Sequence, residues 1–122
     1  MSYPVQNAYT HNPTAVRSFR DIEYSIIAKT TQNLITAYQN KDSNYIGFIE
    51  ALYKNEILWS TLVSDVACKE NKLPDDLKRG IIYLYNFITD HSKKIRCGSS
   101  NIDSLIEINK SILRGLKSEG AH

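Results

Sequence analysis

Apolar side chains recur at intervals of three and four residues in four separate stretches of the chain, and this spacing constrains the fold more than any other feature. Such intervals place the apolar residues on one face of an α-helix, whereas a half-buried strand would alternate at every second residue. We find no strand-like alternation bounded by turns, no internal repeat and no Gly-rich loop. The pattern predicts an all-α fold, a small bundle of about four helices.

A short polar segment divides the first helix from the second. We expect these helices over about residues 15–38 and 44–67, because the sequence NKDSN at 40–44 is rich in residues that favour turns. The predicted inner faces are Val16, Phe19, Ile26, Ile27, Thr30, Leu34 and Tyr38 in the first helix and Phe48, Ile49, Leu52, Trp59, Leu62, Val63 and Val66 in the second.

The third helix has both a start and an end signal. Pro74 suits a first helical turn, where its missing N–H would be unpaired anyway, and Asp75 and Asp76 place negative charge near the positive end of the helix dipole. Three cations and then Gly98, which can adopt positive φ, mark its end. A fourth helix is expected over about residues 100–117. The predicted inner faces are Leu77, Ile81, Leu84, Phe87, Ile88 and Ile95 in the third helix and Ile102, Leu105, Ile106, Ile112, Leu113 and Leu116 in the fourth.

The chain is long enough for one domain and too short for two ordinary ones. We expect residues 15–117 to form that single helical domain. Residues 1–14 are expected to form an extended N-terminal arm, because Pro4 and Pro13 discourage helix. Residues 118–122 are expected to be a disordered tail.

Charge and composition narrow the function classes. Fifteen basic and 13 acidic side chains give a net charge of +2, which lacks the basic excess typical of nucleic-acid-binding proteins. Cys68 and Cys97 lie far apart and have no metal-ligand spacing, so we expect two free thiols. The chain has neither a long apolar run nor a secretory signal. These features predict a cytoplasmic protein without membrane insertion.

Catalytic motifs are missing from the sequence. It contains no GxSxG elbow, no HExxH pair, no calcium-binding loop and no P-loop. We therefore expect a protein that is not an enzyme and carries no cofactor or metal.

Some polar residues fall on the predicted apolar faces. Glu23 is expected to pair with Arg20 one turn away or to accept a hydrogen bond from the Trp59 indole, with partner binding as the alternative. Asn55 is expected at the edge of the apolar arc and Glu56 inside it. Glu56 either extends to water or lies on a face shared with a second protein.

Three further residues of this kind lie on the later helices. Asn109 is expected to be buried and to fix the register of packed helices through its hydrogen bonds. His91 is interpreted as a hydrogen-bonded core histidine. Gly80 indicates a second helix that crosses close by, because Gly otherwise costs about 1 kcal/mol in a helix interior.

Residues 55–116 contain a combination of motifs that resembles the FlaF family of flagellar biosynthesis regulators of alphaproteobacteria. The motif residues are Asn55, Leu58, Trp59, Leu62, Asp65 and Val66, then Asn71, Leu73, Pro74, Leu77 and Lys78, then Leu105 to Asn109, Ile112, Gly115 and Leu116. Upstream, Arg20 and Glu23 resemble the family's Arg-x-x-Glu, although Phe19 stands where the family often has Pro. The resemblance covers roughly residues 17–117.

The resemblance implies a non-enzymatic protein that acts on flagellin. It implies direct binding of flagellin as an adaptor or secretion chaperone that promotes flagellin synthesis or export, alongside the regulator FlbT. A small helical bundle suits this role, because it can offer an apolar groove to an amphipathic helix.

We expect the partner-binding surface among apolar residues that lie outside the predicted inner faces of the helices. The candidates are Tyr45, Tyr53 and Ile57 with Glu56 on the second helix, and Ile82 and Tyr85 on the third. Two alternatives remain. One is post-transcriptional regulation through binding of flagellin mRNA to one basic patch, which would contain Lys78, Arg79, Lys93, Lys94 and Arg96. The other is a structural subunit of the flagellar apparatus.

Overall fold

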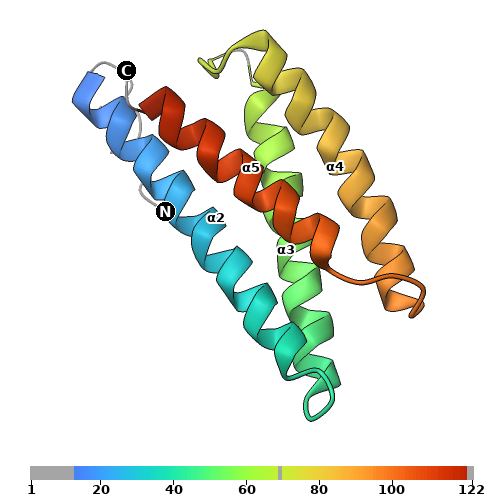
Figure 1. The fold of residues 1–122 in the computed structure, drawn as a ribbon. Helices are drawn as coiled ribbons and strands as arrows, with labels where there is room; N and C mark the ends of the chain where they lie inside the picture. Colours follow the sequence, from blue (N-terminus) through green and yellow to red (C-terminus); the bar gives the residue numbers. More distant parts are fainter. Residues whose placement is uncertain (1–12, 69, 121–122) are drawn as a thin grey trace.

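The computed structural model describes residues 13–68 and 70–120, with side chains described from residue 23 to residue 117. This part of the chain contains four α-helices and no strand. They are α2 (Pro13–Gln39), α3 (Tyr45–Val66), α4 (Asp75–Arg96) and α5 (Asp103–Gly120), shown in Figure 1. The predicted all-α fold is therefore confirmed.

Both ends of the helical region differ from the predicted bounds. Helix α2 begins at Pro13, so two residues predicted in the arm are helical, because Pro is tolerated in the first turn. Residues 1–12, the rest of the predicted arm, lie outside the described residues. Helix α5 continues through Gly115 to Gly120, so residues 118–120 of the predicted tail are helical. Residues 121–122 lie outside the described residues.

Helix α2 packs against both α3 and α5, and α4 packs mainly against α3 (Figure 1). Helices α4 and α5 make few contacts, and they diverge from the loop that connects them. The backbones of α3 and α5 do not come close to each other, so long side chains make the connection between them. Among the described helices, none covers the remaining side of the α3–α4 pair.

The core follows the predicted faces with local shifts of one residue. Ile26 and Ile27 were both expected inside, but neighbouring residues in a helix point about 100° apart. Ile27 is buried, whereas Ile26 is 50% exposed. In the same way Thr31 is buried and the predicted Thr30 is only half-buried. Phe87 was also expected inside and is 40% exposed. The buried apolar side chains are Ile27, Leu34, Phe48, Ala51, Leu52, Trp59, Val66, Ile81, Ile88, Ile95, Ile102, Leu105, Ile106, Ile112 and Leu116.

The end of α4 confirms the stop signal in the sequence. Gly98 adopts a φ of 78° and donates its backbone N–H to the carbonyl oxygen of Ile95 at 2.9 Å. The backbone N–H of Ser99 is donated to the carbonyl oxygen of Lys94, also at 2.9 Å. These two bonds form a Schellman motif, which satisfies carbonyl groups that the helix itself leaves unpaired.

Candidate partner-binding surface

Three residues of the family-like motifs meet Thr31 in the centre of the bundle. Asn109 on α5 accepts a hydrogen bond from the Trp59 indole at 2.9 Å. Its amide nitrogen donates to Asn55 Oδ1 at 2.8 Å and to Thr31 Oγ1 at 3.0 Å. All four side chains are buried, so this polar cluster ties α5 to both α2 and α3. The predicted burial of Asn109 is confirmed.

A second group of motif residues braces the connection between α3 and α4. Asn71 Nδ2 donates to Asp65 Oδ2 at 3.1 Å, and Asn71 Oδ1 accepts from the backbone N–H of Leu73 at 2.9 Å. The carbonyl oxygen of Asn71 accepts from Lys78 Nζ at 2.9 Å. Pro74 follows as the N-cap residue of α4, with an extended ψ of 146°. These contacts give Asp65 and Asn71 a structural role in the connection between the two helices.

The structure corrects the positions or contacts predicted for Glu23, Asn55 and Glu56. The Trp59 indole donates to Asn109, so the alternative in which Glu23 accepts this bond is wrong. Glu23 is half-buried and makes an interaction, whereas the side chain of Arg20 lies outside the described residues. Asn55 was expected at the edge of the apolar arc but is fully buried. Glu56 was expected inside the apolar arc, but it is only partly buried and lies at the edge of that arc.

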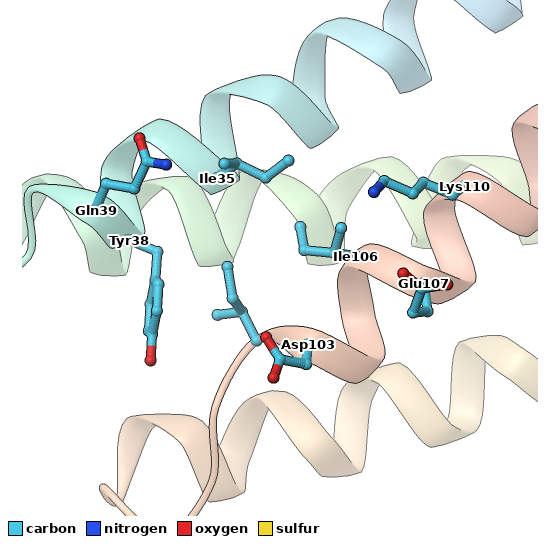
Figure 2. Close-up of a pocket in the computed structure, with 8 residues that line it drawn as sticks. Ile35, Tyr38, Gln39, Asp103, Ile106, Glu107 and Lys110 are labelled. Atoms are coloured by element: carbon cyan, nitrogen blue, oxygen red, sulfur yellow. The ribbon is translucent and has the colours of Figure 1, made fainter.

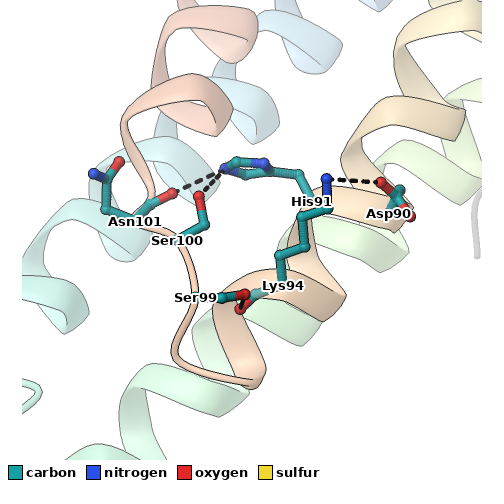
Figure 3. A network of polar contacts seen from close by, with 6 residues as sticks. All are labelled: Asp90, His91, Lys94, Ser99, Ser100 and Asn101. Carbon is teal, nitrogen blue, oxygen red and sulfur yellow. Dashed lines mark hydrogen bonds and ion pairs between the residues drawn. The ribbon is translucent and has the colours of Figure 1, made fainter.

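His91 and Gly80 were also misplaced by the sequence pattern. His91 is half-buried and lies at the α4–α5 connection, not in the core (Figure 3). Its predicted hydrogen bonding is confirmed, because Nε2 lies 3.0 Å from the carbonyl oxygen of Asn101 and 3.1 Å from Ser100 Oγ. Its ring stacks on Phe87 with 5.2 Å between the ring centroids. Among the described residues, no atom outside the local backbone of α4 lies within 4 Å of a Cβ placed on Gly80, so the expected helix crossing there is wrong.

Four of the predicted partner-binding apolar residues are exposed. Tyr53 is 61% exposed and Ile57 47%, and Tyr45 and Ile82 are exposed to a similar degree. Tyr85, predicted among the exposed residues, is partly buried against the core. The pattern also missed exposed apolar residues, because it treated them as core or left them unassigned. These are Ile26, Ile46, Tyr83 and Phe87.

Apolar residues form stripes on two adjacent helices. Ile46, Tyr53 and Ile57 share a face of α3, because residues seven and eleven positions apart align on a helix. Ile82 and Tyr85 align on α4 in the same way. We call these five residues the α3–α4 face.

An ion pair joins the two helices beside these stripes. The guanidinium of Arg96 on α4 pairs with the carboxylate of Glu56 on α3, and both side chains are partly buried. Glu56 lies one turn from Tyr53, and Arg96 lies three turns from Tyr85 on the same side of α4. The pair shows that the sides of α3 and α4 carrying Glu56 and Arg96 face each other, and helical spacing places the two stripes beside these residues.

The charges on α4 differ between its two sides. Away from the α3–α4 face, Arg79 pairs with Asp76 and Lys94 with Asp90, at i,i+3 and i,i+4 spacing. Three members of the predicted basic patch, Arg79, Lys94 and Arg96, are therefore each paired with a carboxylate. Its remaining members, Lys78 and Lys93, are fifteen residues apart, which corresponds to about 22 Å along the helix.

A separate groove of about 480 Å³ lies between α2 and α5 (Figure 2). Its floor is apolar, and its rim carries two carboxylates one turn apart, Asp103 and Glu107, together with the ammonium group of Lys110. Glu107, a residue of the family-like motif, is exposed on this rim, whereas Asn109 of the same motif is buried. The groove is lined by Ile35, Tyr38, Gln39, Ile102, Asp103, Ile106, Glu107 and Lys110.

Cys68 and Cys97 are exposed free thiols, as predicted. Within the described ranges, no three His, Cys, Asp or Glu side chains come close enough together to hold a metal ion. No helix in this part of the chain combines the length and the apolar character needed to cross a bilayer.

Comparison with known proteins gives one match. The family model described as "Flagellar protein FlaF" matches residues 5–116. No curated protein and no solved structure matches the chain. The family match includes α3 and α4, the whole polar cluster and the brace at Asn71. Because it spans most of the sequence, the chain belongs to the FlaF family of flagellar proteins.

Proposed function

We propose that this protein binds flagellin as a cytoplasmic, non-enzymatic adaptor or chaperone and thereby promotes flagellin synthesis or export, alongside FlbT. Membership of a flagellar family supports the choice of pathway. The observation that carries the proposal is the α3–α4 face, where bulky apolar side chains remain exposed beside an interhelical ion pair. Clustered apolar residues of this kind are typical of protein-interaction surfaces.

The geometry suits capture of a helical segment. Adjacent helices present parallel rows of side chains, and the shallow depression between two rows accepts the apolar face of a third helix. Ile46, Tyr53 and Ile57 span eleven residues of α3, which corresponds to about 16 Å. This length matches roughly three turns of a bound helix.

RNA binding through α4 has less support. Arg79, Lys94 and Arg96 each pair with a carboxylate, which reduces the positive charge available for phosphate groups. A titration of flagellin transcript with salt tests this alternative. Tight binding that favours this transcript over an unrelated RNA would support it, and uniformly weak binding that disappears with salt would contradict it.

The flagellin proposal is tested by binding of purified monomeric flagellin to the wild-type protein and to a Tyr53→Ala, Ile57→Ala double variant. Both residues are exposed, so the fold should persist and circular dichroism should stay unchanged. We expect at least about tenfold weaker binding, because central aromatic and aliphatic anchors contribute on the order of 1–2 kcal/mol each.

Tyr83→Ala provides the matched control. Tyr83 is 74% exposed on α4, but it lies about 100° around the helix from Ile82 and thus off the α3–α4 face. This variant should bind flagellin as the wild type does. Absence of flagellin binding to the wild-type protein would contradict the proposed function. Equal losses in the two variants would contradict its location.

A further inference from the structure

The α3–α4 face has an uneven distribution of charge along its two edges. On α4, Lys78, Ile82, Tyr85 and Lys93 share one side of the helix, with the two lysines at its ends. Neither lysine forms an ion pair among the described residues, and Lys78 Nζ donates to a backbone carbonyl oxygen. Asp75 lies on the same side of α4, one turn before Lys78, so the α4 edge carries two cations and one carboxylate and is cationic at its Lys93 end.

The carboxylates near the centre of this face do not cancel the charge of Lys93. Glu56 already pairs with Arg96, which lies between the two stripes. Glu50 lies on the exposed stripe of α3, but Lys54 is one turn further along, in the favourable Glu-to-Lys order. The α3 edge is thus close to neutral, and the excess positive charge lies on α4.

From this asymmetry we propose that the α3–α4 face binds an amphipathic helix of flagellin whose flank over α4 carries carboxylates; the inference rests on the proposed function. The apolar side of that helix packs over Tyr53, Ile57 and Ile82. Its acidic flank lies beside Lys93. Since Lys93 and Ile82 are eleven residues, or about 16 Å, apart, the bound segment extends over about three turns.

Opposite charge along one flank also determines direction and register. An apolar contact alone permits a helix to bind in either orientation or to slide by one turn. A carboxylate placed beside Lys93 favours one arrangement, because surface charges act on specificity and association rate more than on total affinity. The charged edge therefore favours this flagellin segment, with its acidic flank, over amphipathic helices that have basic flanks.

The test compares Lys93→Glu with Lys29→Glu, using monomeric flagellin as the probe. Both lysines are exposed and form no ion pair among the described residues, and both substitutions change the net charge equally. Lys29 lies on α2, away from the α3–α4 face. At about 50 mM salt we expect Lys93→Glu to bind about fivefold more weakly than Lys29→Glu, and at about 500 mM salt we expect equal binding.

A charge exchange completes the experiment. Flagellin fragments first locate the bound helix, and Lys is then introduced for the acidic residues along one flank. This flagellin should bind the wild-type protein weakly and the Lys93→Glu variant more tightly. If flagellin binds and the Tyr53, Ile57 variant loses it, yet Lys93→Glu behaves like Lys29→Glu, the charge inference is wrong and the proposed function stands. If wild-type protein retains no flagellin, both fail.

Discussion

The indole N–H of Trp59 donates to Oδ1 of Asn109 at 2.9 Å, between two fully buried side chains on helices whose backbones do not touch. An indole can only donate, so the atom of Asn109 that faces it is the amide oxygen. The amide nitrogen of Asn109 therefore faces Asn55 and Thr31, which accept its two hydrogens. Thr31 in turn donates its hydroxyl to the carbonyl oxygen of Ile27 at 2.7 Å. The Trp59 indole thus determines which groups in the cluster donate hydrogen bonds and which accept them.

The first prediction concerns Asn109→Leu. This substitution keeps the number and branching of the side-chain heavy atoms, but it leaves the Trp59 indole and the Asn55 carbonyl group buried without their partner. We expect the free energy of unfolding to fall by about 3 kcal/mol, since each buried polar group left unpaired costs about 1–3 kcal/mol. Urea unfolding followed by circular dichroism measures this. Asn33→Leu, on the exposed side of α2, is the control and should change stability by less than about 0.5 kcal/mol.

The second prediction tests whether Trp59 acts through this bond. Trp59→Phe should destabilise the wild-type protein through both lost volume and an unpaired Asn109 oxygen. In the Asn109→Leu background the second cost no longer exists. We therefore expect Trp59→Phe to cost about 1 kcal/mol less there, as measured by a double-mutant cycle. Additive costs would show that the hydrogen bond contributes nothing beyond packing.

The sequence pattern was sufficient for the four helices and for the burial of Asn109. It failed for Asn55 and Glu56, because a broad apolar arc does not locate its own centre to within one residue. Adjacent helical positions differ by about 100°, so an error of one residue exchanges a buried position for the edge. The partner that keeps Asn55 inside is Asn109, 54 positions further along the chain.

The partner-binding surface was predictable only in part for the same reason. Tyr53 and Ile57 were identified because they lie off the main stripe, and both are exposed. Tyr85 was misassigned because the spacing does not say how closely α4 approaches α3. Gly80 was misread because a Gly shows only that close packing is allowed, whereas topology decides which helix is near. No other described helix comes within 4 Å of its Cβ position.

The third prediction follows from that open space. Gly80→Ala should raise the free energy of unfolding by about 1 kcal/mol, because Ala is favoured over Gly in a helix interior and the added methyl group meets no atom. An increase in the urea midpoint with an unchanged slope would confirm it. A decrease would mean that a neighbouring group occupies this space in solution.

Gly47→Ala provides the contrasting case. A Cβ on Gly47 would clash with Asn44 Nδ2, and the Asn44 side chain caps α3 by accepting the Gly47 N–H at 3.0 Å. The methyl group must displace this cap, which contributes about 1 kcal/mol. We expect that loss to offset the gain in helix propensity, so Gly47→Ala should be less stable than Gly80→Ala by about 1 kcal/mol. Equal stabilisation by both substitutions would contradict the cap geometry.

The last prediction concerns Asn71, whose side chain joins the end of α3 to the start of α4. Asn71→Ala removes the bond to Asp65 and the bond from the Leu73 N–H, and we expect a loss of about 1–2 kcal/mol. Lys72→Ala, at the exposed neighbouring position, should change stability little.

Asn71→Asp separates the two bonds, because it keeps an acceptor for Leu73 but places a carboxylate beside that of Asp65. Two adjacent carboxylates raise each other's pKa in the folded protein, so the protonated forms are favoured there. Stability is then lost as the pH rises through those pKa values and recovered below about pH 4. Urea unfolding of Asn71→Asp and Asn71→Ala at both acidic and neutral pH measures the difference. Parallel pH profiles for the two variants would show that Asp65 does not face residue 71 in solution.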